Sequence, residues 1–78
     1  MSWNYRVLKR QHGSDVSYGV YEVYYDDEGR VVACSESATE PYGDTFEELV
    51  EDLKLFSVAA TQPPLDYDEI VDIEEKGL

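Results

Sequence analysis

The sequence predicts a single α+β domain, in which a three-stranded antiparallel meander carries one amphipathic helix packed on one face. Two hairpins followed by a capped helix predict this class. Three segments rich in β-branched and aromatic residues are separated by turn signals that contain Gly13 and Gly29, and a segment of helical periodicity follows them. A length of 78 residues allows one hydrophobic core. We expect residues 1–62 to form this β-β-β-α core and residues 63–78 to form an acidic, partly ordered C-terminal segment.

The predicted strands are residues 3–10 (WNYRVLKR), 16–25 (VSYGVYEVYY) and 30–37 (RVVACSES), with the second strand in the middle. The loop QHGSD and the turn DDEG set the expected register, in which Tyr5 lies opposite Tyr21. Successive side chains alternate between the two faces of a sheet. The expected core face holds Trp3, Tyr5, Val7, Tyr21, Val23, Tyr25, Val32 and Cys34. The expected outer face holds Leu8, Tyr18, Val20, Tyr24 and Val31 around Glu22, with Arg6 placed for a diagonal pair with that carboxylate.

The segment PYGDTFEELVEDLKLF, residues 41–56, predicts a helix that begins at Thr45. Thr45 followed by Glu48 is a capping-box pattern, and Pro63 in TQPP stops the helix because proline lacks a backbone donor. The apolar side chains recur at helical spacing, and we expect them to pack on the core face: Phe46, Leu49, Val50, Leu53 and Phe56. Beyond the prolines, acids alternate with apolar residues, and the pattern near residues 65–71 fits a short fourth strand as well as a short helix.

Negative charge is concentrated in the second half of the chain. The net charge is −12, and residues 1–25 hold three bases against two acids, a net of +1, so the remainder carries −13. The helix is expected to turn Glu47, Glu48, Glu51 and Asp52 outward, with Lys54 as its only base. Such a surface repels nucleic-acid phosphates and anionic lipid and attracts basic protein surfaces. We therefore expect no direct nucleic-acid binding and no membrane partner.

The side chains that carry chemistry are sparse. Cys34 is the only cysteine and His12 the only histidine, and Glu22, the one carboxylate in apolar surroundings, is expected to stay ionised beside Arg6. The acidic C-terminal segment does not match a calcium loop, because Ile70 and Val71 stand where an oxygen ligand and glycine are needed. We expect no enzyme activity, no cofactor and no metal. A lone cysteine and the absence of an apolar leader or membrane-length segment predict a cytoplasmic location.

The motifs GVYEVYYDDEGR, YGDTFEEL and PPLDYDE resemble those of a family of small bacterial proteins of uncharacterised function, over residues 5 to about 70. More distantly, three strands followed by GDTFEEL at a helix start resemble the N-terminal domain of HicB-type antitoxins. That resemblance implies a partial ribonuclease-H-like β-β-β-α-β unit with a non-catalytic core, which binds and blocks a small basic RNA-cleaving toxin. The segment CSESATEPY replaces the Gly-Cys turn that usually precedes the GDT motif in that family.

These observations predict a non-enzymatic binding module that neutralises or regulates a basic partner protein, as an antitoxin does. One alternative is a phage-type nucleic-acid mimic that inhibits a defence complex, as anti-CRISPR proteins do. Another is a structural homodimer formed through the edge of the third strand or the outer sheet face. The predicted partner-binding residues are Glu47, Glu51, Asp52, Asp66, Asp68, Glu69, Tyr18 and Tyr24.

Overall fold

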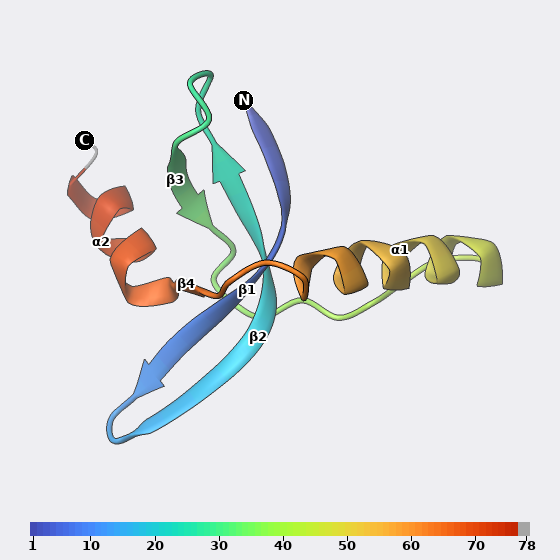
Figure 1. The fold of residues 1–78 in the computed structure, drawn as a ribbon, viewed down its shortest axis with the longest axis horizontal. Coiled ribbons are helices and arrows are strands. Elements are labelled where there is room, and N and C mark those ends of the chain that lie inside the picture. Colours follow the sequence, from blue (N-terminus) through green and yellow to red (C-terminus); the bar gives the residue numbers. More distant parts are fainter. Residues whose placement is uncertain (77–78) are drawn as a thin grey trace.

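The computed structural model describes residues 1–76 as one sheet with two helices. The elements follow in the order β1 (Ser2–His12), β2 (Asp15–Tyr25), β3 (Val31–Cys34), α1 (Phe46–Ala59), β4 (Leu65–Asp66) and α2 (Tyr67–Lys76). The strand order is β3-β2-β1-β4, with β4 parallel to β1 and the other neighbours antiparallel (Figure 1). The predicted α+β class and the meander are confirmed, and the described chain adds a fourth strand and a second helix.

The first hairpin differs from its predicted register by one residue. His12 pairs with Asp15 around a two-residue turn whose Gly13 has a φ of 61°, so Tyr5 lies opposite Glu22 and not opposite Tyr21. A tight turn replaces the five-residue loop QHGSD that the sequence suggested. Because a shift of one residue moves every side chain of a strand to the other face, Tyr5 and its alternate neighbours Trp3 and Val7 lie opposite the predicted core face.

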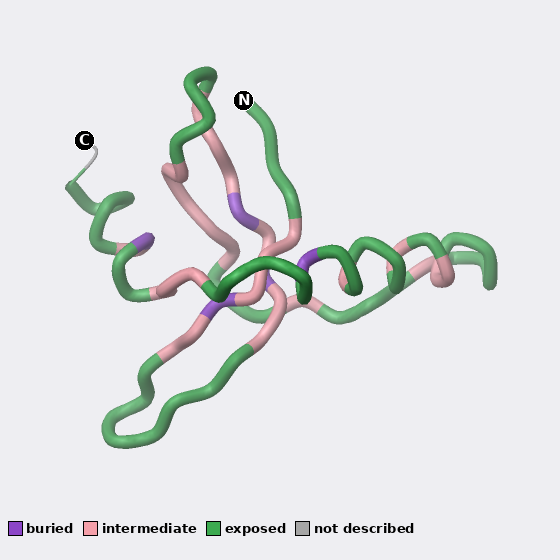
Figure 2. Tube along the Cα trace, in the orientation of Figure 1, coloured by how far each residue is buried: buried purple, intermediate pink, exposed green. Residues whose placement is uncertain are grey.

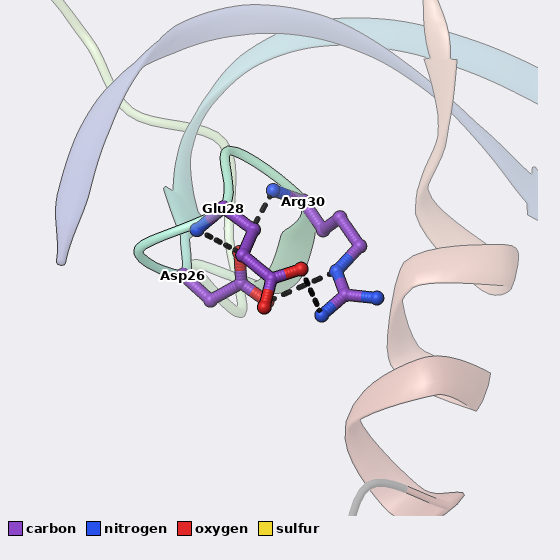
Figure 3. Close-up of polar contacts among 3 residues, drawn as sticks. All are labelled: Asp26, Glu28 and Arg30. Atoms are coloured by element: carbon purple, nitrogen blue, oxygen red, sulfur yellow. Dashed lines mark hydrogen bonds and ion pairs between the residues drawn. The ribbon is translucent and has the colours of Figure 1, made fainter.

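The second hairpin keeps Cys34 on the expected face but pairs it with Val23, two positions from the expected partner Tyr21. A bulge between Tyr24 and Tyr25 pairs Tyr25 with Val31, and Val31 packs against the core instead of lying on the outer face. The turn before β3 is closed by Asp26 and Arg30, as Figure 3 shows. The strands lie where the sequence predicted them, except that β3 ends at Cys34 and not at residue 37, while their pairing differs from the prediction.

The core lies between the sheet and α2. Leu8, Tyr21, Val23 and Ile70 form the buried cluster, and Leu8 belongs to the face that the sequence assigned to solvent. Figure 2 shows that buried positions are few and lie mainly on the central parts of β1 and β2, with further ones on the two helices. The C-terminal segment is therefore both strand and helix and covers the core. Residues 77–78, the end of the segment predicted to be partly ordered, lie outside the described residues.

Helix α1 has the predicted N-terminus. Thr45 Oγ1 accepts a 3.1 Å hydrogen bond from the Glu48 backbone N–H, while Glu48 Oε1 accepts one from Asp44 N, one residue before the expected donor. A side chain at Gly43 would clash with the backbone of Leu49, so glycine is needed where the chain folds back onto the helix.

Helix α1 does not pack on the core face, which corrects the prediction. It projects away from the sheet, and α2 extends on the opposite side (Figure 1). The reason is that α2 covers the core face, which holds Leu8, Tyr21 and Val23. Helix α1 contacts the other face of the sheet, where the observed register places Tyr5.

Candidate functional site: the projecting helix α1

The inner side of α1 is held to the sheet near its C-terminal half. The Tyr5 ring lies 4.7 Å from the Phe56 ring between centroids, and the Tyr5 hydroxyl donates a 3.0 Å hydrogen bond to Asp52 Oδ1. The backbone N–H of Tyr42 donates to Asp52 Oδ2 at 2.9 Å. Burial, then the hydrogen bond to Asp52 and the charge of that carboxylate, raise the pKa of the Tyr5 phenol. Asp52, predicted to bind a partner, thus anchors α1 to its own chain.

The outer side of α1 leaves apolar side chains in solvent. Phe46, Leu49, Val50 and Leu53 follow helical spacing, and we call them the α1 stripe. Phe46 is 76% exposed and Leu53 is 48% exposed, while Leu49 and Val50 are half-buried. The exposed colour dominates α1 in Figure 2. Phe46 and Leu53 of the apolar face that the sequence assigned to the core are therefore available for contact, and Leu49 and Val50 are partly so.

Acidic side chains border this helix. Glu47 and Glu51 are exposed, and Lys54 Nζ forms an ion pair with Glu51 Oε1 at 3.1 Å. An exposed pair of this kind contributes about 0–1 kcal/mol, so an incoming base can exchange with Lys54 at little cost. Two predicted site residues, Glu47 and Glu51, thus share one helix face beside apolar residues.

A groove lies between α1 and the start of β1. Its volume is about 360 Å³, and we call it the Trp3 groove. Its walls are Trp3, Asn4, Tyr5, Leu55, Val58, Ala59 and Gln62. Trp3 meets Tyr5 edge to face with ring centroids 5.3 Å apart. This groove could not be predicted from the sequence, because its walls come from two segments at least fifty positions apart and no local pattern joins them.

The predicted acidic binding residues of the C-terminal segment lie on β4 and α2, not on α1. Asp66 Oδ1 accepts hydrogen bonds from the backbone of Asp68 and Glu69, at 2.9 and 3.4 Å, and so caps α2. Asp68 Oδ2 accepts from the Gln11 backbone N–H at 3.4 Å, and Glu69 is exposed. Since α1 and α2 project on opposite sides of the sheet (Figure 1), the predicted acidic residues form two surfaces and not one.

The two predicted tyrosines are also apart. Tyr18 is exposed and pairs with Lys9 near the tip of the first hairpin. Tyr24 is half-buried, and its hydroxyl donates a 2.8 Å hydrogen bond to Glu22 Oε1, which raises the pKa of the Tyr24 phenol. Arg6 does not face Glu22, because it is opposite Tyr21 and donates to the Pro63 carbonyl instead.

A second cavity of about 460 Å³ lies beside β3 and α2 and includes Cys34, Glu36, Tyr67, Val71, Glu74 and Glu75. Burial, and secondarily the charge of Glu74, raise the pKa of the Cys34 thiol. A raised thiol pKa leaves little thiolate at neutral pH, which makes Cys34 a poor nucleophile.

Within residues 1–76, no group of three histidine, cysteine or acidic side chains is arranged to hold a metal ion. In the same described range, no helix has the length and apolar character needed to cross a membrane.

The chain was compared with known protein families, curated proteins and solved structures, and none of them matches it. The geometry of α1 and its surroundings therefore carries the functional argument.

Proposed function

We propose that this chain is a non-enzymatic binding module that engages a basic partner protein through helix α1. The exposed α1 stripe carries this proposal, since Phe46 and Leu53 lie in solvent on a helix whose sequence pattern is that of a buried face. Contiguous exposed apolar side chains rimmed by polar residues mark protein interaction sites. A helix of this kind binds by laying its apolar face into a groove of the partner.

Charge selects the kind of partner. The chain has a net charge of −12, and Glu47, Glu48 and Glu51 lie on the same helix as the stripe. A basic protein would be steered toward this surface, with an on-rate that falls as salt is added. A second copy carries the same −12 and would be repelled, which favours a different protein over the homodimer.

The stripe also separates this proposal from nucleic-acid mimicry. A mimic needs carboxylates spaced like phosphates along a continuous surface, whereas the predicted acidic binding residues divide between α1 and the segment of β4 and α2, on opposite sides of the sheet. The HicB-type resemblance supplies a concrete partner class, a small basic toxin that the module would block, and this antitoxin-like role belongs to the proposal.

The test begins with a partner and ends with a titration. Proteins captured from the source cell at low salt would be ranked by charge, and the strongest basic candidate would be purified and titrated calorimetrically against the chain. We expect tight binding that weakens as salt rises. The double variant Phe46→Ser/Leu53→Ser should weaken it by about tenfold or more, because each lost apolar contact removes roughly 1 kcal/mol.

Val16→Ser is the matched control, because Val16 is 45% exposed, close to the 48% of Leu53, and lies on the first hairpin away from α1. Equal loss in the control and the double variant would refute the role of α1. Binding that ignores salt would refute the basic partner, and a sedimentation mass of two copies would support the homodimer instead.

A further inference from the structure

We propose that the Trp3 groove receives one large apolar side chain of the partner, while basic side chains of the same segment lie along Glu51 and Glu47. This inference rests on the proposed function and specifies the chemistry of the segment that is bound: an apolar anchor with arginines or lysines on one side of it.

The walls of the groove are suited to an apolar side chain. Trp3 and Leu55 are each 52% exposed and Val58 is 58% exposed, although all three surround a hollow of about 360 Å³. That volume is at the small end of ligand pockets, which span roughly 300–1,000 Å³, and accommodates a single phenylalanine or leucine side chain. Among the lining residues only Asn4 and Gln62 carry amide side chains, and the Tyr5 hydroxyl is hydrogen-bonded to Asp52.

Carboxylates lie next to the groove, toward the N-terminal end of α1. Glu47, Glu51 and Leu55 are each four residues apart and Val58 follows three later, so helical spacing places them along one side of the helix. The apolar wall therefore lies toward the C-terminal end of α1 and the carboxylates toward its N-terminal end. A bound segment with one apolar side chain and neighbouring bases matches this side of α1. Its apolar side chain would lie in the groove and its bases beside the carboxylates.

Lys54 lies on the same side and pairs with Glu51 at 3.1 Å. Both groups are exposed, so the pair is weak and a base from the partner can replace Lys54. This gives the inference an unusual consequence: removal of a positive charge at Lys54 should strengthen binding of the segment.

A second copy of this chain does not supply the matching segment. Its adjacent bases Lys9 and Arg10 follow Leu8, whose side chain is fully buried, and the Arg10 guanidinium lies 3.9 Å from the centre of the Tyr67 ring. Arg30 follows a turn and pairs with Asp26 and Glu28. Of the other bases, Arg6 donates to the Pro63 carbonyl, and Lys54 and Lys76 are single lysines that pair with acids of their own helices. The described residues therefore contain no run of bases beside an exposed apolar residue.

The test uses capped hexapeptides and the intact chain. Trp3 is the only tryptophan, so its fluorescence reports directly on the groove. The probe carries one phenylalanine followed by arginines; one comparison peptide has alanine in place of phenylalanine, and another has glutamates in place of the arginines. We expect a saturable change in emission with the probe below about 5 mM, and affinity at least about tenfold lower for both comparison peptides.

Variants then locate the contact. Leu55→Ser should weaken the probe by about tenfold, whereas Val16→Ser, at an exposed apolar residue of the first hairpin outside the groove, should leave it within about twofold. Lys54→Gln should tighten it, and Glu47→Gln should reduce its salt dependence. Val58→Ser provides a second groove variant if Leu55→Ser does not keep its helical circular dichroism.

Three results would overturn the inference: no saturable change with the probe, equal affinity for the alanine peptide, or equal loss in Val16→Ser and Leu55→Ser. A shift of Trp3 emission with protein concentration alone would mean that a second copy fills the groove. The proposed function is separately decided, because the Phe46→Ser/Leu53→Ser variant tests the stripe with a whole partner and leaves the groove intact.

Discussion

The Tyr5 hydroxyl donates a 3.0 Å hydrogen bond to Asp52 Oδ1, and this contact ties the base of α1 to the centre of β1. Asp52 also accepts from the backbone of Tyr42, so a single carboxylate joins the strand, the helix and the segment that precedes the helix. The direction in which α1 projects depends on this junction, and with it the shape of the Trp3 groove, of which Tyr5 is one wall.

Removal of the Tyr5 hydroxyl should therefore destabilise the fold. In Tyr5→Phe the half-buried Asp52 loses a donor, and we expect the free energy of unfolding to fall by about 1–2 kcal/mol. Urea denaturation measures this change. Tyr18→Phe is the control, because Tyr18 is exposed on the hairpin. A Tyr5→Phe variant as stable as the parent chain would mean that the hydrogen bond does not hold α1.

Two isoleucines of α2 test whether that helix covers the core. Ile70 is buried against Leu8, Tyr21 and Val23, whereas Ile73 on the same helix is half exposed. Ile70→Ala should cost about 2–4 kcal/mol because it leaves a cavity, and Ile73→Ala should cost less than about 1 kcal/mol. Thermal and urea unfolding of both variants give the comparison. Equal, small effects would show that the C-terminal segment is peripheral, as the sequence suggested.

The sequence predicted those parts of the fold that depend on neighbouring residues. The Thr45 cap is set by a hydroxyl and an amide three residues apart, and the strands are set by runs of β-branched and aromatic residues. Pairing depends on the turn: Gly13 supports a two-residue turn where a longer loop was also compatible with the sequence, and the choice moved a whole face.

The role of α2 was hidden for a similar reason. The acids and apolar residues of the C-terminal segment alternate in a way that fits a strand and a helix alike. The pairing of Leu65 with Leu8 and of Asp66 with Lys9 shows where the strand stops. For the candidate site, helical spacing predicted that Glu47 and Glu51 would be exposed. Helical spacing could not predict the Trp3 groove, because the observed register of β1 and β2, and not the helix, places Trp3 on the face beside α1.

The turn before β3 predicts a response to acid. The backbone N–H of Arg30 lowers the pKa of Asp26 most, and the Glu28 N–H and the Arg30 guanidinium add to it against a smaller opposing effect of desolvation (Figure 3). A carboxyl whose pKa is lower in the folded chain stabilises the fold above its unfolded pKa, near 3.8, and this contribution is lost as the pH falls through its lower folded value.

Asp26→Asn should consequently lower stability at pH 7 and lose most of that effect near pH 2. Urea midpoints of the parent chain and the variant, measured across this range, report the difference directly. Asp15→Asn, at an exposed position of the other hairpin, should show no comparable convergence. A constant gap between parent and Asp26→Asn at every pH would show that the carboxyl charge does not stabilise the turn.

The chain's two phenylalanines provide the most direct test of a projecting α1. Phe56 packs on the Tyr5 ring, while Phe46, three turns away on the same helix, is mostly in solvent. Phe56→Ala should lower the free energy of unfolding by about 1–2 kcal/mol, because it removes a half-buried ring that packs on Tyr5. Phe46→Ala should change the free energy of unfolding by less than about 0.5 kcal/mol. Chemical denaturation at two protein concentrations distinguishes the outcomes. If Phe46→Ala proves as costly as Phe56→Ala at both concentrations, α1 packs on its own sheet and offers no free stripe. If that cost appears only at the higher concentration, a second copy covers the stripe, and the basic partner loses its binding surface.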